Sequence, residues 1–272
     1  NNMIGNLNST AYSSTTAPYL SIAGIYVSAG TVNLYNNTVF IPASSTSSGT
    51  NASAAAVYAS TSATLLMQNN LLVNRSVPKG LGKSIAYGRS STTLTSYASA
   101  SNNNSFLGTS GIFWDGTNFY PDLVTYKPAI GGRDVRSVSV NPVFVSETGV
   151  DAGYLHIPNS ATPNLLESGG ILVPAVATDF DGDARPGPAG SVNGGAIPDF
   201  CDIGADEFDG SPSLTCTTPT PGNTIASANA ICFGQSTILS VQNPPAVQET
   251  GYTYQWQSSS DGITYSDISG AN

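Results

Sequence analysis

Residues 32–41 read VNLYNNTVFI, and residues 65–73 read LLMQNNLLV. Both place an Asn-Asn pair between two short apolar runs. A looser copy, NNSF, lies at residues 103–106, and the chain begins with the pair Asn1-Asn2. The four pairs are 35, 33 and 34 residues apart. A period of this size is the signature of a repeat architecture, so we expect a stack of similar turns.

The repeats contain strand patterns. Short runs of residues alternate between apolar and polar side chains, which is strand spacing, and no segment sustains the 3.6-residue period of an amphipathic helix. The sequence therefore predicts an all-β chain. The runs are too short and uneven for propeller blades, which use about 40–45 residues each. A right-handed parallel β-helix, the pectate-lyase-like solenoid, fits better, with polar insertions such as 43–54 lengthening a coil.

The parallel β-helix gives the Asn pairs a structural role. Successive coils would lie about 4.8 Å apart, so residues one repeat apart would stack above each other. Stacked Asn amides can then donate to and accept from their neighbours along the axis. We expect such a structural ladder from Asn2, Asn37, Asn70 and Asn104. The alternative is that Asn is common in turns and its regular spacing is a coincidence.

Charge is scarce and unevenly distributed. Charged residues make up 9% of the 272 residues, against about 25% in ordinary domains. Residues 1–110 contain four basic residues and no Asp or Glu, so all 17 acids follow them. No basic patch with interleaved aromatic residues is present, which argues against a nucleic-acid partner. No apolar run approaches the roughly 18 residues of a membrane span.

Three motifs follow the repeats: NPVF at 141–144, DFDGDARP at 179–186 and DIGADEF at 202–208. Their order resembles the closing region of secreted bacterial (Bacteroidetes-type) right-handed parallel β-helix repeat surface proteins. The chain departs from that pattern by carrying Cys201 before the last motif and Asp206 where an aromatic residue is usual. The resemblance implies that the N-terminal part of the chain is the last coils and the cap of such a β-helix.

The composition divides the chain into three parts. The β-helix is expected over residues 1–210, and a Pro/Thr/Ser-rich linker over 211–222. Within residues 223–272, a Cys on one strand pattern precedes a Trp on the next, as in an immunoglobulin (Ig) sandwich. This part is similar to the tandem Ig-like modules of large surface proteins in gliding bacteria. Such a module needs about 100 residues, so we expect an incomplete one, with further domains on both sides of the chain.

The cysteines leave two interpretations open. Cys216 and Cys232 flank a Pro/Gly/Thr segment and could close a small disulfide loop in an oxidising compartment. All three cysteines could equally remain reduced. Cys201 is the unpaired one in the first case.

One candidate metal site is visible in the sequence. Asp179, Asp181 and Asp183 alternate as D-x-D-G-D, like the first oxygen ligands of a calcium loop. The twelfth position, Gly190, is not an acid, so acids within 202–207 would have to complete the shell. The alternative is a polar turn whose carboxylates accept backbone N–H groups. Structural calcium is the one cofactor that the sequence suggests.

The aromatic residues suggest a ligand. Five of them lie within residues 113–126, among Gly and polar residues. Aromatic faces beside polar groups suit stacking on sugar rings, so Trp114, Tyr120 and Tyr126 are candidate carbohydrate-binding residues. The alternative is a loop packed on the coils, burying about 150–250 Å² per ring. The lone His156 is predicted to be an outward-facing strand residue with no functional partner.

The sequence gives little support for an enzyme. Glycoside hydrolysis needs two carboxylates roughly 5–9.5 Å apart, and residues 1–110 contain none. We therefore expect a non-catalytic, structural or adhesive part of a secreted or cell-surface bacterial protein that binds polysaccharides or cell-surface glycans. The resemblance implies export by a type IX-like secretion route. The alternative is the C-terminal part of a β-helix polysaccharide lyase or glycosidase whose catalytic coils lie upstream.

Overall fold

The computed structural model of the protein is mostly strand, with one short α-helix and two 3-10 turns among the described residues. This agrees with the predicted all-β class. No helix in the described part is long and apolar enough to cross a membrane. The structure describes residues 1–7, 19–43, 51–160, 162–187, 200–213, 223–228, 230, 232, 234–242 and 255–269.

The chain forms two compact units, Asn1–Ser213 and Leu214–Asn272. The first unit extends beyond the predicted boundary at residue 210 because strand β13 (Ser211–Pro212) pairs in parallel with strand β12 (Pro163–Asn164). Residues 214–222, most of the predicted linker, lie outside the described residues.

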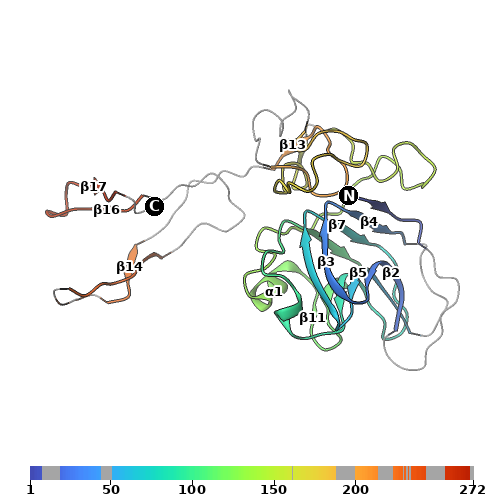
Figure 1. Ribbon diagram of the computed structural model, residues 1–272, viewed down its shortest axis with the longest axis horizontal. Helices are drawn as coiled ribbons and strands as arrows, with labels where there is room; N and C mark the ends of the chain where they lie inside the picture. The colour runs from blue at the N-terminus through green and yellow to red at the C-terminus, as the bar shows by residue number, and fades with distance from the viewer. Residues whose placement is uncertain are drawn as a thin grey trace. The chain divides into compact units, whose positions relative to one another are not determined.

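Three groups of strands recur along the repeats of the first unit (Figure 1). The first group is β2 (Tyr19–Val27), β5 (Ala52–Ala59) and β8 (Ser84–Arg89). The second is β3 (Gly30–Tyr35) and β6 (Ala63–Gln68). The third is β1 (Met3–Ile4), β4 (Thr38–Ile41), β7 (Leu71–Asn74) and β9 (Ser105–Gly108).

Pairing within each group is parallel and joins residues about one repeat apart. Leu34 pairs with Met67 in the second group. In the third group, Val39 pairs with Leu72, which pairs with Phe106. A parallel pair needs a long connection between its strands, and here that connection runs through the other two strand groups. Each passage of the chain therefore adds one strand to the growing sheets.

The first group ends in a hairpin. Strand β10 (Gly111–Trp114) pairs in parallel with β8 and antiparallel with β11 (Phe119–Tyr120). In the second group, the 3-10 turn η1 (Leu94–Ser96) stands beside β6, with a parallel bridge from Leu65 to Tyr97. A helix α1 (Leu123–Tyr126) and a 3-10 turn η2 (Lys127–Ile130) follow the hairpin.

The sheets enclose an apolar interior. Val39, Leu72 and Phe106, register neighbours on the third group, are at most 1% exposed and share one cluster with Val57 and Tyr87 of the first group. Their alternate neighbours in the third group point the other way into a second cluster. Because both faces are covered, β4 and β7 are buried along their whole length.

The motif-bearing segment covers the outer face of the third group. Phe40, Leu71 and Val73 pack there against residues from 138 to 208, including Phe144 and Ile203. The Arg75 guanidinium binds the NPVF motif, since its Nη2 donates to the Pro142 carbonyl at 2.6 Å. Its Nη1 forms an ion pair with Glu147 Oε1 at 2.5 Å, just beyond the motif. The first and third motifs thus contribute to one packing surface on the third strand group.

The predicted ladder residues form one hydrogen-bonded row. The Nδ2 of Asn2 donates to Asn37 Oδ1 at 2.8 Å, Asn37 donates likewise to Asn70 at 2.8 Å, and Asn70 to Asn104 at 2.9 Å. The backbone N–H groups of Asn37 and Asn70 also donate to the next amide in the row. Asn37, Asn70 and Asn104 are at most 2% exposed, so water cannot replace these bonds.

The first member of each pair has a different role. Asn36, Asn69 and Asn103 adopt φ of 50°, 58° and 55°. Asn tolerates this left-handed conformation better than most residues, which lets the chain turn sharply between two strands. Their side chains point to the motif-bearing segment, where Asn69 donates to the Ile171 carbonyl at 2.7 Å and Asn103 to that of Gly169 at 2.9 Å.

The ladder ends on a buried carboxylate. Asn104 Nδ2 donates to Asp134 Oδ1 at 3.0 Å, and Ser137 donates to the same oxygen at 2.7 Å. The hydroxyls of Tyr97 and Tyr126 donate to the other oxygen at 2.6 and 3.0 Å. Asp134 is 0% exposed, and burial raises its pKa although these four hydrogen bonds oppose the rise.

The second unit, described by itself, contains two separate antiparallel pairs. Strand β14 (Thr224–Ala226) pairs with β15 (Leu239–Val241), and β16 (Gln257–Ser258) pairs with β17 (Ser266–Asp267). Most of its described side chains are exposed. Two isolated hairpins do not bury a core, so the described part does not establish the predicted Ig-like module.

We predict that Asn70→Ala lowers the free energy of unfolding by about 2–4 kcal/mol, because it removes the acceptor of the buried Asn37 backbone N–H and two of the amide contacts in the row. Urea unfolding followed by Trp114 fluorescence in a Trp256→Phe background measures the first unit. Gln68→Ala is the control, since the Gln68 amide, in the same turn, makes one exposed hydrogen bond. Equal losses in the two variants would contradict a stabilising ladder.

We also predict that Asp134 makes stability depend on pH. Because its pKa is raised on folding, the folded protein binds this proton more tightly than the unfolded chain. Its contribution is therefore most favourable at acid pH and is lost as the pH rises through the raised pKa. Relative to Asp134→Asn, which cannot titrate, the wild type should lose stability between pH 4 and pH 8. A constant difference in unfolding free energy across this range would refute the prediction.

Candidate functional site

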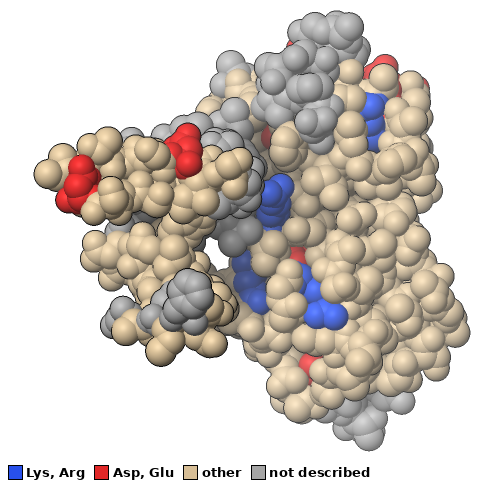
Figure 2. Space-filling view, turned by 60° about the vertical axis from the view of Figure 1, so that its left-hand side comes forward, with Lys and Arg blue, Asp and Glu red and all other residues tan. Residues whose placement is uncertain are grey.

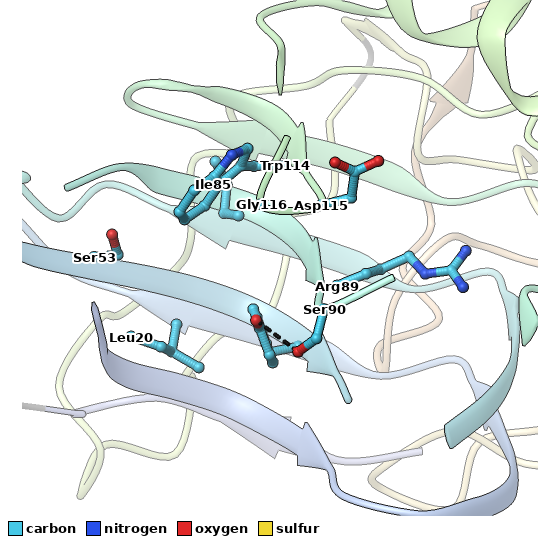
Figure 3. Close-up of a pocket in the computed structure, with 9 residues that line it drawn as sticks. Leu20, Ser53, Ile85, Arg89, Ser90, Trp114, Asp115 and Gly116 are labelled. Atoms are coloured by element: carbon cyan, nitrogen blue, oxygen red, sulfur yellow. Dashed lines mark hydrogen bonds between the residues drawn. The ribbon is translucent and has the colours of Figure 1, made fainter. Parts of the chain in front are cut away.

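A cleft of about 270 Å³ opens on the outer face of the first strand group. Figure 3 shows it as a shallow space over β2, β5, β8 and the end of β10. Its lining residues are Leu20, Ser53, Tyr58, Ile85, Arg89, Ser90, Trp114, Asp115 and Gly116.

The register of the sheet creates the cleft. Tyr26 pairs with Tyr58, Tyr58 with Gly88, and Gly88 with Trp114. A Cβ atom at Gly88 would lie 2.6 Å from Tyr58 Cδ2 and 3.0 Å from Ile85 Cδ1. Tyr58 and Ile85 therefore lean over Gly88, where any side chain would collide with them. Tyr58 of β5 and Trp114 of β10 line the cleft from the two strands that flank β8.

Aromatic faces continue beyond the cleft. The rings of Tyr26 and Tyr58 stack at 5.8 Å with an interplanar angle of 18°. Tyr26 is 57% exposed, so one face of this stack is open to solvent. Figure 2 shows that uncharged residues cover most of the visible face of the molecule. The exposed aromatic stack beside the cleft favours a ligand that has flat faces of its own.

The polar groups of the cleft are mainly hydroxyls. The Tyr58 hydroxyl lies 2.9 Å from Ser90 Oγ, the dashed contact in Figure 3. Ser53 Oγ, at the other end, accepts the backbone N–H of Lys83 at 2.9 Å. Hydroxyls both donate and accept, so they can exchange these contacts for hydrogen bonds to ligand hydroxyls.

The two charged residues of the cleft serve the fold. Arg89 Nη2 donates to the Thr93 carbonyl at 2.9 Å. The carboxylate of Asp115 accepts the backbone N–H groups of Thr117 and Asn118 at 2.9 and 2.6 Å, which closes the β10–β11 turn. Both side chains point away from Trp114 and Ile85 in Figure 3. Neither is poised as a free acid or base.

The three predicted carbohydrate-binding residues have different environments in the structure. Trp114 lines the cleft and is partly exposed. Tyr126 is 1% exposed, with its hydroxyl on Asp134, and cannot stack on a ligand. Tyr120 packs against Tyr126 and Phe113, with ring centroids 6.0 and 5.8 Å away. These two tyrosines are therefore packed against the fold, as the alternative interpretation proposed. Sequence reasoning missed Tyr58, which lines the cleft together with Trp114, and Tyr26, which stacks on Tyr58.

The D-x-D-G-D segment forms a polar turn. Asp179 Oδ1 accepts the backbone N–H groups of Asp181 and Asp183 at 2.9 and 2.8 Å, and its Oδ2 accepts that of Glu207 at 3.0 Å. Asp181 instead pairs with His156. The carboxylate of Asp179 is therefore used within the fold, as in the polar-turn alternative, and the calcium loop of Asp179, Asp181 and Asp183 stays a prediction.

A buried ion pair joins the last two motifs. Arg185 Nη1 donates to Glu207, and its Nη2 donates to the Gly204 carbonyl at 3.0 Å. Burial raises the pKa of Glu207 to about 7, although the Arg185 charge opposes the rise. Burial also raises the pKa of Asp202, and the neighbouring Glu207 carboxylate raises it further. These groups hold the second and third motifs together against the coils.

The cysteines show no shared site. Cys201 is buried and its thiol donates to the Ile171 carbonyl at 3.2 Å. The amide of Asn69 donates to its sulfur at 3.5 Å, and burial raises the thiol pKa to about 12, so it is a poor nucleophile. Cys232 is an exposed free thiol and Cys216 lies outside the described residues. The Cys216–Cys232 disulfide therefore stays a prediction.

The prediction for His156 was wrong. His156 lies outside the described strands, and its Nε2 faces Asp181 and Asp206 at 2.5 and 4.0 Å. These partners are 25 and 50 residues distant in the sequence. Local spacing could not reveal them, because two turns of the motif-bearing segment bring them together.

A comparison with protein families matches residues 221–272 to a domain of unknown function (DUF8696). The match covers the second unit and leaves the repeats without an assigned family. No curated protein and no solved structure matches the chain.

Proposed function

We propose that the first unit is a non-catalytic, adhesive scaffold of a secreted or cell-surface bacterial protein, and that its cleft binds a glycan chain. The scaffold would be the final coils of a right-handed parallel β-helix, as the motifs at 141–144, 179–186 and 202–208 imply. The observation that carries the binding proposal is the cleft lined by the aromatic side chains of Tyr58 and Trp114.

The parallel register supports the β-helix interpretation. Three strand groups receive one strand from each passage of the chain, and their pairing joins residues about one repeat apart. The internal Asn row is the contact expected between coils of constant spacing. A rigid rod of this kind would hold a binding surface away from its attachment point, as an adhesin requires.

The shape of the cleft supports a sugar ligand. Tyr58 and Trp114 offer aromatic faces on which a flat ring can stack. Sugar rings offer C–H groups on their faces and hydroxyls at their edges. The faces would meet the aromatic rings, and the edges would meet the hydroxyls of Tyr58 and Ser90. An extended polysaccharide could continue over the Tyr26–Tyr58 stack.

The contacts within the cleft favour binding over catalysis. Asp115 holds its own turn and Arg89 holds the Thr93 carbonyl. A lyase or glycosidase would need such groups free to reach the substrate. No observation on the described residues favours that alternative over binding.

We predict that the wild-type chain binds a subset of neutral polysaccharides on a glycan array and that Trp114→Ala weakens this binding by about tenfold or more, because one stacking face is lost. Gly88→Ala should weaken it as well, since the new methyl group would displace Tyr58. Isothermal titration of the wild type and each variant with the glycans that bind gives the dissociation constants.

Val124→Ala serves as the matched control, because Val124 is 83% exposed on α1 and does not line the cleft. It should bind as the wild type does. Thermal melting checks that each variant is folded. A wild type that binds no glycan, or a folded Trp114→Ala variant with unchanged affinity, would refute the proposal.

A further inference from the structure

His156, Asp181 and Asp206 form a compact cluster at the side of the coils, away from the residues that line the cleft. One potential ligand atom from each residue lies within 4.8 Å of the other two. His156 comes from the segment after the NPVF motif, Asp181 from the polar turn, and Asp206 from the DIGADEF motif. The second and third motifs therefore meet here with the segment that follows the first.

The histidine is oriented for its Nε2 to accept a cation. Its Nδ1 lies 3.1 Å from the Tyr154 carbonyl oxygen. A carbonyl oxygen only accepts hydrogen bonds, so Nδ1 carries the proton in the neutral ring, and Nε2 keeps its lone pair. That lone pair faces two carboxylates, which also only accept when ionised. The space between them is therefore suited to a proton or to a metal ion.

Hydrogen bonds fix the Asp206 carboxylate and the backbone of Asp181. Asp206 Oδ2 accepts the N–H of Ile157 at 2.7 Å, and the residue is only 7% exposed. Its Oδ1 is the atom that lies 4.0 Å from His156 Nε2. The backbone of Asp181 is fixed by its hydrogen bond to Asp179 Oδ1 at 2.9 Å. A carbonyl or carboxylate partner that orients a ligating group is typical of metal sites.

We propose that His156 Nε2, Asp181 and Asp206 bind one divalent transition-metal ion, with zinc as the representative of the class. An imidazole nitrogen suits zinc and its neighbours in the first transition row, whereas calcium takes six to eight oxygen ligands. Asp181 has a side chain that is 47% exposed, so the ion can enter from solvent and complete its shell with water.

The distances require small movements. Ligand atoms on one tetrahedral zinc at about 2.1 Å lie about 3.4 Å from each other. The contact of His156 with Asp181 at 2.5 Å would lengthen, and that with Asp206 at 4.0 Å would shorten. Each of these two changes is below about one ångström, and the Asp181 and Asp206 oxygens, which lie within 4.8 Å of each other, would approach by at most about 1.4 Å. Side-chain rotation at Asp181 and His156 can supply these movements. The site would pin the polar turn to the closing motif, a role independent of glycan binding.

Isothermal titration of the full chain, produced without a polyhistidine tag, with zinc chloride tests the proposal. We expect one zinc ion per chain, and a reduction in affinity of about tenfold or more in His156→Ala and Asp181→Asn. Asp183→Asn is the matched control, because it removes the same charge from the same turn and Asp183 is not part of the cluster. It should bind zinc as the wild type does.

A second measurement does not depend on variants. The chain has a single histidine, so acylation of its imidazole by diethyl pyrocarbonate reports on His156 alone. Zinc should slow this reaction in the wild type, and calcium should not. The proposal is overturned if the wild type binds no zinc, if His156→Ala binds it equally, if Asp183→Asn loses as much affinity as Asp181→Asn, or if zinc leaves the acylation rate unchanged.

Discussion

The hydrogen bond from one Asn amide to the next is the interaction on which the first unit depends. An amide both donates and accepts, so Asn37, Asn70 and Asn104 can repeat one contact indefinitely along the stack. A net contribution of about 0.5–1.5 kcal/mol per bond is modest. The cost of breaking one is larger, because these amides are buried. The row therefore selects the register in which successive strands pair.

Register in turn decides what the outer face of the sheet presents. Once β5 and β8 are aligned, Tyr58 stands beside Gly88, and Trp114 follows on β10. A shift of one residue would exchange buried and exposed side chains and would remove the cleft. The proposed glycan-binding surface and the internal amide row are thus linked through the same parallel pairing, although they lie on opposite sides of the backbone.

Sequence reasoning was strongest where the signal repeats. The period of the Asn pairs placed Asn2, Asn37, Asn70 and Asn104 in one row, and the structure brings these residues together. It was weakest for residues without a repeat. Tyr120 and Tyr126 looked like Trp114 in a local window, yet they pack inward, because the helix after β11 turns back onto the core.

Composition, period and alternation by themselves determined the all-β class, the repeat length and the internal role of the Asn pairs, because these properties depend on residues at fixed spacing. Only the tertiary structure decided which aromatic ring faces solvent, that Asp179 binds its own turn, and that His156 meets Asp181 and Asp206. Those contacts join residues dozens of positions apart. Their partners are chosen by how the motif-bearing segment folds against the coils, which no local pattern encodes.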